Sequence, residues 1–290
     1  LGGGLDVELS LAKSDGSFMA PLSTVDNLDG TYPALYTNKE PGQYEIRAAV
    51  GGENIPKVPF EFVAGPVTLA HTLVISEAGV VGELGEFSAG AASAFFVQFR
   101  DEWFNVRKEG NDLAAVQHVL RAPDGSDLAT DVAYEAATGS YKVTFTTQRT
   151  GELTLLVTHL GEGLVDAKTG KPFAARVTSI EPDSGKSEVF GAGVERTVAG
   201  VPTQYSLLMR DQYGNVLTGA AITDPLVQLV LVGKDGPSAE ELALTTRSVA
   251  YVGDGLYALE YLPPSYSAEY TLEITTTLPG GQIAGKFVSV

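Results

Sequence analysis

The chain has 290 residues, of which 44% are hydrophobic, and it carries a formal net charge of −17 without a single cysteine. The lack of cysteine excludes disulfide bonds, thiolate metal sites and a cysteine nucleophile. The acidic charge disfavours nucleic acid and anionic membranes as direct partners, and no apolar stretch reaches the length of about 20 residues that crosses a bilayer.

Short runs of alternating apolar and polar residues, bounded by Gly, Pro, Asp and Asn, predict β-strands along the whole chain. Helical periodicity is hard to find, so the sequence predicts an all-β fold. In chain order, the predicted strands cover residues 5–11, 94–100, 115–121, 130–135, 141–146, 153–158, 172–178, 185–194, 203–209, 226–232, 242–252, 256–262, 269–276 and 283–290.

Two turn markers recur at an interval of about 110 residues. The first is an Asp-Gly pair and the second is a Gly-x-Tyr motif. They stand at Asp15-Gly16, Asp124-Gly125 and Asp235-Gly236, and at Gly30-x-Tyr32, Gly139-x-Tyr141 and Gly255-x-Tyr257. This period is too long for a solenoid coil and fits a small sandwich domain. We therefore predict tandem immunoglobulin-like β-sandwiches arranged as a rod.

The repeat divides the chain into three units, with boundaries near Gly65-Pro66 and Glu181-Pro182. We call residues 1–64 the first unit, 65–179 the second unit and 180–290 the third unit. The first unit begins at the strand that stands third in the others. It therefore lacks two strands, and we expect either a fragment of a longer protein or strands supplied from elsewhere. Without Gly/Ser linkers, the units should be joined tightly.

The first unit carries three further motifs, a strand start, a turn and a last strand: Asp29-Gly30-Thr31-Tyr32, Glu40-Pro41-Gly42-Gln43-Tyr44 and Asn54-Ile55-Pro56-x-x-Pro59-Phe60. With these motifs the unit resembles a filamin-type immunoglobulin repeat, with Val58 in place of the usual serine. The other units keep parts of it: Thr138-Gly139-Ser140-Tyr141, Lys171-Pro172-Phe173 and Asp254-Gly255-Leu256-Tyr257. The resemblance implies an immunoglobulin-like sandwich that serves structure and protein binding.

Residues suited to catalysis or metal binding are scattered rather than grouped. The three histidines, His71, His118 and His159, match no metal-ligand spacing. The run Ser184-Gly185-Lys186-Ser187 looks like the end of a phosphate-binding loop, but Ile180 stands where that loop needs its first glycine. We predict that the protein is not an enzyme and has no catalytic, cofactor-binding or metal-binding residues.

The predicted strand 226–232 of the third unit is one candidate for a protein contact. Its outer face carries Gln228, Val230 and Val232, where a solvent-facing strand should be polar. The filamin resemblance implies that partner peptides add a strand at this edge of the sandwich. The alternative is that a neighbouring domain or the chain's own loops cover the two valines.

Trp103 and Phe104 form a second candidate. They lie in the turn 101–105, which matches the turn 211–215 at a shift of 110 residues. Exposed aromatic residues can anchor an interface with another protein. The alternative is that they plug the junction between two units.

Taken together, the sequence predicts a structural scaffold that spaces or docks partner proteins, as part of a larger chain or assembly. The absence of cysteine and of N-x-Ser/Thr glycosylation sites favours a location on the cytoskeleton or in a cilium. The alternative is an extracellular or cell-surface adhesion module. We expect other proteins as partners, with neither nucleic acid nor membrane insertion.

Overall fold

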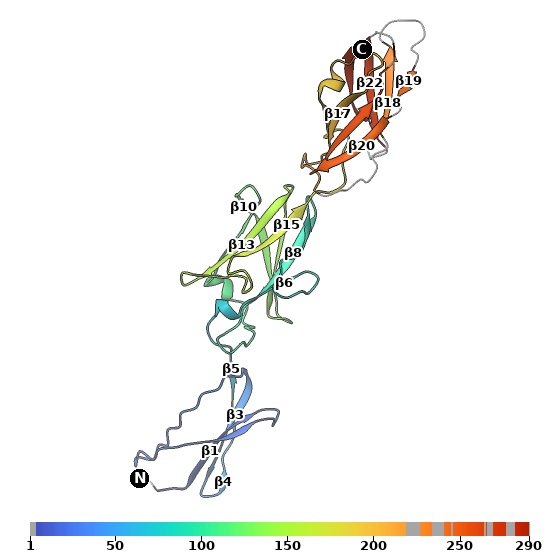
Figure 1. The fold of residues 1–290 in the computed structure, drawn as a ribbon. Coiled ribbons are helices and arrows are strands. Elements are labelled where there is room, and N and C mark those ends of the chain that lie inside the picture. The colour runs from blue at the N-terminus through green and yellow to red at the C-terminus, as the bar shows by residue number, and fades with distance from the viewer. Residues whose placement is uncertain are drawn as a thin grey trace.

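A computed structural model describes residues 4–218, 227–233, 241–244, 246–263, 265, 269–276 and 282–289, with side chains for 4–218, 248–263 and 265. Within these ranges, all regular structure is β-strand except for three short 3-10 helices. The strands gather in three groups that follow one another along an elongated rod (Figure 1). The prediction of an all-β protein built from tandem immunoglobulin-like sandwiches is confirmed.

The first unit contains one antiparallel sheet, in the order β2-β1-β3-β4 with β5 also paired to β3. Its strands are β1 (Val7–Lys13), β2 (Met19–Leu22), β3 (Gly42–Val50), β4 (Glu53–Asn54) and β5 (Val58–Phe62). The strand start predicted at Gly30 forms no ladder. Residues 31–37 make an isolated bridge, between Thr24 and Ala34, and belong to no ladder among the described residues.

The second unit contains two sheets, in the orders β10-β9-β13-β15-β7 and β11-β12-β8-β6, with β14 paired to β13. Its elements are η1 (Leu69–His71), β6 (Leu73–Ser76), β7 (Phe87–Ser88), β8 (Ala92–Gln98), η2 (Asp112–Ala114), β9 (Gln117–Arg121), β10 (Asp127–Leu128), β11 (Thr130–Glu135), β12 (Ser140–Thr146), β13 (Gly151–His159), β14 (Glu162–Gly163) and β15 (Phe173–Thr178).

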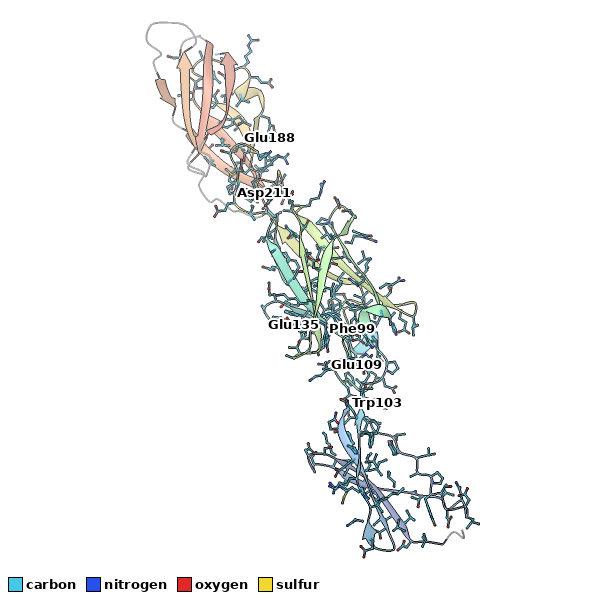
Figure 2. The ribbon with its side chains drawn as sticks, turned by 180° about the vertical axis from the view of Figure 1, so that it is seen from behind. Phe99, Trp103, Glu109, Glu135, Glu188 and Asp211 are labelled. Atoms are coloured by element: carbon cyan, nitrogen blue, oxygen red, sulfur yellow. The ribbon has the colours of Figure 1, made fainter. Side chains whose placement is uncertain are left out.

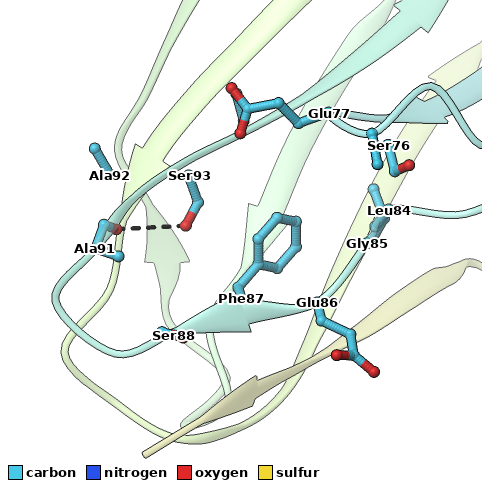
Figure 3. Close-up of a pocket in the computed structure, with 12 residues that line it drawn as sticks. Ser76, Glu77, Leu84, Gly85, Glu86, Phe87, Ser88, Ala91, Ala92 and Ser93 are labelled. Atoms are coloured by element: carbon cyan, nitrogen blue, oxygen red, sulfur yellow. Dashed lines mark hydrogen bonds between the residues drawn. The ribbon is translucent and has the colours of Figure 1, made fainter. Parts of the chain in front are cut away.

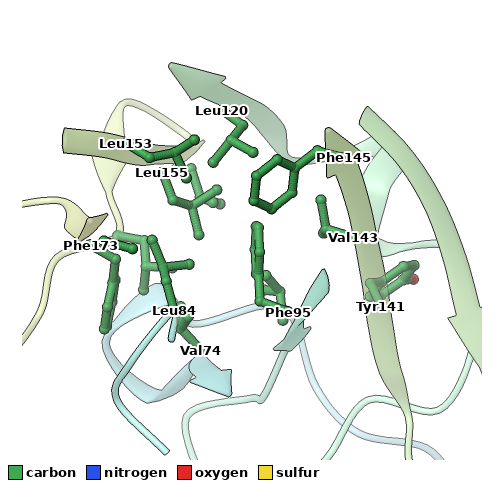
Figure 4. Packing of buried hydrophobic residues seen from close by; sticks show 14 of the residues in the cluster. Val74, Leu84, Phe95, Leu120, Tyr141, Val143, Phe145, Leu153, Leu155 and Phe173 are labelled. Carbon is green, nitrogen blue, oxygen red and sulfur yellow. The ribbon is translucent and has the colours of Figure 1, made fainter. Parts of the chain in front are cut away.

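Alternating side chains of both sheets fill the core of the second unit (Figure 4). Along β13, Leu153 and Leu155 point inward while the residues between them face outward. They meet Phe95 of β8 and Phe145 of β12 from the opposite sheet. This period of two is what the sequence pattern predicted, because successive side chains of a strand point to opposite faces.

The third unit again contains two sheets, in the orders β16-β17-β21-β20 and β19-β18-β22-β23. Its elements are β16 (Glu188–Phe190), η3 (Ala192–Val194), β17 (Thr203–Leu208), β18 (Val227–Gly233), β19 (Glu241–Leu244), β20 (Thr246–Gly253), β21 (Leu256–Tyr261), β22 (Glu269–Thr276) and β23 (Gln282–Ser289). The predicted turn Asp235-Gly236 lies outside the described residues.

Among the described strands, none pairs with a strand of another unit. We therefore retain 1–64, 65–179 and 180–290 as proposed domains. The middle one has a closed core between two sheets, whereas the first has a single sheet.

Residues 1–64, expressed alone, should show little cooperative unfolding, because one sheet without a covering layer buries too little apolar surface to offset chain entropy. Residues 65–179 should unfold in one sharp thermal transition. Circular dichroism melts of the two pieces test the difference, and a sharp transition for 1–64 would contradict the proposed division.

Candidate functional site: the junctions between units

The turn that follows β8 is organised by a buried carboxylate, that of Asp101. Its Oδ1 accepts hydrogen bonds from the backbone N–H groups of Trp103 and Asn105, each with an N···O distance of 2.9 Å. Its Oδ2 accepts a hydrogen bond from the Asn105 side-chain amide, also at 2.9 Å. The carboxylate thereby closes the turn and fixes the direction of Asn105.

Asp101 also receives a hydrogen bond from the chain that enters the second unit. The Gly65 N–H donates to Oδ2 at 2.9 Å. Burial acts to raise the pKa of Asp101, but the hydrogen bonds from Asn105, Gly65 and Trp103 outweigh it and hold the pKa below its ordinary value. The charged form is therefore the one that the fold selects.

From this turn, Asn105 reaches back to the first unit. Its amide nitrogen donates a hydrogen bond to the backbone carbonyl of Lys39 at 2.6 Å. The Lys39 ammonium in turn lies 3.9 Å from the centroid of the Trp103 ring, a cation–π contact. Trp103 accordingly lies where the two units meet (Figure 2).

Arg107 ties the same junction from the other side of the turn. Its side chain is 12% exposed, and the guanidinium donates hydrogen bonds to the carbonyls of Ala64 and Gly65, in the segment that joins the two units. It also pairs with the buried Asp112 and, at 3.0 Å, with Glu109. The planar guanidinium can make these contacts together because its N–H groups point in fixed directions.

The second junction repeats the arrangement of the first. Asp211 is buried, and its Oδ1 accepts hydrogen bonds from the N–H groups of Tyr213 at 3.0 Å and Asn215 at 2.9 Å. The Asn215 amide donates to Asp211 Oδ2 at 2.9 Å and to the carbonyl of Gln148 in the second unit at 2.7 Å. Figure 2 shows Asp211 between the second and third units.

The acceptor carbonyls occupy equivalent places in the two preceding units. Lys39 and Gln148 each lie three residues before the first residue of a strand, Gly42 of β3 or Gly151 of β13, and both glycines have positive φ, +147° and +129°. At both junctions, the Asp-to-Asn turn of the following unit, 101–105 or 211–215, thus contacts the equivalent carbonyl of the preceding unit, that of Lys39 or Gln148. We call this contact, Asn105 to Lys39 and Asn215 to Gln148, the asparagine clamp.

The two junctions differ in their apolar contacts. Tyr213, which stands where the first junction has Trp103, packs against the core of the second unit. Gly90 makes room for it, since a Cβ atom there would lie 2.0 Å from the Tyr213 hydroxyl. Thr218 and Ser179 add a polar contact, with the Thr218 N–H donating to Ser179 Oγ at 2.9 Å.

The structure thus places Trp103 at the junction, facing Lys39, with 45% of its surface still exposed. Phe104 is 61% exposed and stacks on the imidazole of His71, at 3.8 Å between ring centroids. Its φ of +65° is a left-handed conformation that glycine adopts freely, and the equivalent residue of the third unit is Gly214, with φ +84°.

The predicted contact strand of the third unit is paired on both sides. In β18, Val230 pairs with Ala243 of β19 and with Glu273 of β22, and Val232 is paired likewise. Over residues 229–232 a peptide therefore finds no free backbone edge, whereas Gln228 pairs only with Thr275 of β22 in the described ladders. The side chains of Gln228, Val230 and Val232 lie outside the described ones.

The equivalent strand of the second unit has the more open edge. β9 pairs with β10 only at Leu120 and Arg121, whereas the ladder between β18 and β19 has four pairs. The outer backbone edge of residues 117–119 is therefore unpaired within the described ladders. Behind it, Leu113, His118 and Val132 line a small apolar cavity of about 20 Å³ between the two sheets.

A pocket of about 520 Å³ opens beside β7 (Figure 3). Its polar lining consists of the carboxylates of Glu77 and Glu86 and of serine hydroxyls, among them Ser93, which donates to the Ala91 carbonyl at 3.4 Å. A serine nucleophile needs an adjacent base such as histidine or lysine, and neither lines this pocket.

Within the described residues, no group of three or more His, Asp or Glu side chains is arranged to hold a metal ion. In the same part of the chain, no helix is long and apolar enough to cross a membrane.

Stacked sandwiches joined by docked turns define a tandem immunoglobulin-like protein. More specifically, residues 2–61 match the family model of the Filamin/ABP280 repeat, which confirms the predicted filamin-type repeat there. Similarity to filamins extends along most of the chain. Filamin-C of Rattus norvegicus is 25% identical over 274 residues, and filamin-A of Drosophila melanogaster is 23% identical over 274 residues.

These alignments cover 93% and 92% of this chain but only 8% and 11% of the two filamins. Among solved structures, FdeC, an adhesin of Escherichia coli, has a TM-score of 0.58 at 20% identity, covering 100% of this chain and 86% of its own. Invasin, a bacterial integrin-binding protein, has a TM-score of 0.54 at 15% identity, covering 99% and 53%. The two adhesins share the fold of this chain.

Replacing Asp101 by asparagine should lower the free energy of unfolding of the second unit by about 1–3 kcal/mol at neutral pH, because buried N–H donors lose their charged acceptor. The native pKa lies below 3.8, so the carboxylate stabilises the fold above pH 3.8, and that stability is lost as pH falls through the native pKa.

Denaturant unfolding between pH 7 and pH 2 tests this expectation. D101N should show a weaker loss of stability on acidification than the wild type. Asp127→Asn, an exposed position, serves as the matched control. Parallel pH profiles for wild type and D101N would show that this carboxylate does not carry the effect.

Proposed function

We propose that the chain is a non-enzymatic segment of a rod that spaces or docks partner proteins. The asparagine clamp, formed at both junctions with the same geometry, supports this proposal. Two repeated contacts of this kind set the orientation of each unit relative to the one before it. A string of units with fixed orientations keeps its ends at a defined separation, which is what a spacer needs.

The proposed cellular setting depends on which similarity is taken as the guide, the one to filamins or the one to adhesins. The filamin relatives favour a scaffold on the cytoskeleton. The fold shared with FdeC and invasin suits the alternative, an adhesion or recognition module at a cell surface. The relatives lend no support to a ciliary setting, and we do not propose it.

Removing both clamps should shorten and broaden the distribution of end-to-end distances. Each lost hydrogen bond weakens its junction by about 0.5–1.5 kcal/mol. Because Arg107 also holds the first junction, the informative variant combines Asn105→Ala, Arg107→Ala and Asn215→Ala. Small-angle X-ray scattering of the 290-residue chain measures the maximum dimension and its spread.

Asn54→Ala, an exposed asparagine in β4, is the matched control and should scatter like the wild type. Unchanged scattering of the triple variant, with its units still folded by circular dichroism, would contradict the spacer proposal.

The second part of the proposal is that partner proteins dock on the rod. The candidate docking strands are β9 and β18, which occupy equivalent positions in the second and third units. In β9 the free backbone edge of residues 117–119 suits the addition of a strand from a partner peptide. In β18 the backbone of residues 229–232 is already paired on both sides, so a contact there would use the side chains of Gln228, Val230 and Val232.

Replacing Val230 and Val232 by threonine removes apolar contact area while keeping β-propensity. At about 25 cal/mol per Å² of apolar surface, the loss should weaken partner binding by on the order of 1–3 kcal/mol. This corresponds to about a 5- to 150-fold lower affinity. Capture of partners from native extract, quantified by mass spectrometry, compares this variant with Val119→Thr in β9. If the double variant unfolds readily yet captures every partner, the valines belong to the core.

A further inference from the structure

The hydrogen-bond frame of the two junctions does not by itself select which unit docks on which. The turns 101–105 and 211–215 make the same internal hydrogen bonds between their aspartate and their asparagine. The acceptors in the preceding units are backbone carbonyls, which every residue type supplies. Either turn therefore satisfies the carbonyl of Gln148. Selection between the two turns has to come from the side chains beside the frame.

The two turns differ in the aromatic residues that they carry. The turn 101–105 reads Asp-Glu-Trp-Phe-Asn, and the turn 211–215 reads Asp-Gln-Tyr-Gly-Asn. The third residue is thus Trp103 in one turn and Tyr213 in the other. Trp103 makes its cation–π contact with Lys39, whereas Tyr213 packs against the core of the second unit. The ring at this position is what distinguishes one docking turn from the other.

Tyr213 enters a socket whose floor is Gly90. A Cβ atom at Gly90 would overlap the hydroxyl group and the outer ring carbons of Tyr213, so a side chain at position 90 would fill the place of the ring. The φ angle of Gly90 is +77°, in the left-handed region that glycine adopts freely. Gly90 therefore leaves open the space that the end of the tyrosine ring occupies.

The socket is tied to the asparagine clamp by two consecutive carbonyls. The Gly90 N–H donates to the carbonyl of the buried Thr147 at 2.7 Å. The next residue, Gln148, gives its carbonyl to the Asn215 amide, and the Thr150 N–H donates back to Asn215 Oδ1 at 3.3 Å. The floor of the socket and the acceptor of the clamp thus belong to one hydrogen-bonded segment. A ring too large for the socket holds the asparagine away from its acceptor.

We propose that Gly90 and Tyr213 determine which unit docks on the second unit. The partner that the socket accepts is a filamin-type repeat whose docking turn reads Asp-x-Tyr-Gly-Asn, as the third unit does. A turn with tryptophan in place of the tyrosine is rejected, because the larger indole has no room above Gly90. This selection rests on the proposed spacer function, since the choice of a neighbour matters where the junction fixes an orientation.

Selection of this kind keeps the units in order when several copies of the chain meet. The turn 101–105 of one copy then competes with the turn 211–215 for the Gln148 carbonyl of another copy. The shared hydrogen bonds favour both turns equally, so the difference in affinity comes from the fit of the ring. The socket therefore favours the third unit over a second unit from a neighbouring chain.

Pulsed electron paramagnetic resonance across the second junction tests the socket. Spin labels at Glu162→Cys in the second unit and Glu195→Cys in the third, both at exposed positions, report the distribution of distances between the two units. In the 290-residue chain we expect one narrow distribution. Tyr213→Trp should broaden it, because the indole does not enter the socket. Tyr213→Phe, which keeps the ring and loses only the hydroxyl, should leave it narrow.

Gly90→Ala tests the floor of the socket. The added Cβ should expel the Tyr213 ring and broaden the distribution as Tyr213→Trp does. Gly125→Ala is the matched control, because Gly125 has a similar positive φ of +84°, and a Cβ there would meet no atom of the described residues within 4 Å. It adds the same kind of backbone strain without touching a junction, and the distribution should stay narrow.

A narrow distribution in either Tyr213→Trp or Gly90→Ala would overturn the selection by the socket and leave the spacer function intact. Equal broadening in Tyr213→Phe or Gly125→Ala would overturn it as well, because neither change alters the fit of the ring. A broad distribution in the labelled chain without these substitutions would reject the fixed orientation itself and both proposals with it. Circular dichroism melts confirm that the units are folded. If Gly90→Ala unfolds the second unit, Tyr213→Trp decides alone.

Discussion

The arrangement of the rod depends on one buried carboxylate at each junction. Asp101 and Asp211 are both removed from solvent, and an isolated charge in that position would be costly. Each is stabilised by backbone and side-chain N–H donors of its own turn. The donors that satisfy the charge also fix the asparagine, whose second N–H then reaches the preceding unit. The same hydrogen-bond frame thus closes the turn and joins the two units.

The two junctions share this polar frame and differ in what surrounds it. The first adds a guanidinium, that of Arg107, where the third unit has Leu217. The second adds the ring of Tyr213, which packs into the core of the second unit. A common hydrogen-bond frame sets the same register, while the neighbouring residues adjust the strength of each contact. We expect the first junction to depend more on salt than the second, since only the first adds the arginine Arg107 to the hydrogen-bond frame.

Much of this organisation is readable from the sequence. The strands follow from period-two alternation, and the repeat follows from turn markers at fixed spacing. The matching turns 101–105 and 211–215 are also visible, including both Asp and Asn. Their role is not, because the acceptors are backbone carbonyls of Lys39 and Gln148, and any residue type supplies a carbonyl. The sequence therefore pointed to Trp103, which is conspicuous, and not to Asn105.

Strand edges were equally hard to foresee. Val230 and Val232 break the expected alternation, but whether their strand has a free edge depends on the length of the neighbouring strand. β19 pairs along β18 for four residues, while β10 meets β9 for only two. In the same way, residues 31–37 carry a strand pattern and form no ladder. Pairing requires a partner at the right place, and local sequence does not encode that.

We infer that the asparagine clamp and Arg107 hold the first and second units in one orientation. Because the chain lacks cysteine, two spin labels can be attached at introduced cysteines, Glu53→Cys in the first unit and Glu162→Cys in the second, both at exposed positions. Pulsed electron paramagnetic resonance then measures the distribution of distances between them. We expect one narrow distribution that broadens when Asn105→Ala and Arg107→Ala are added. A broad distribution in the unmodified junction, unchanged by those substitutions, would contradict it.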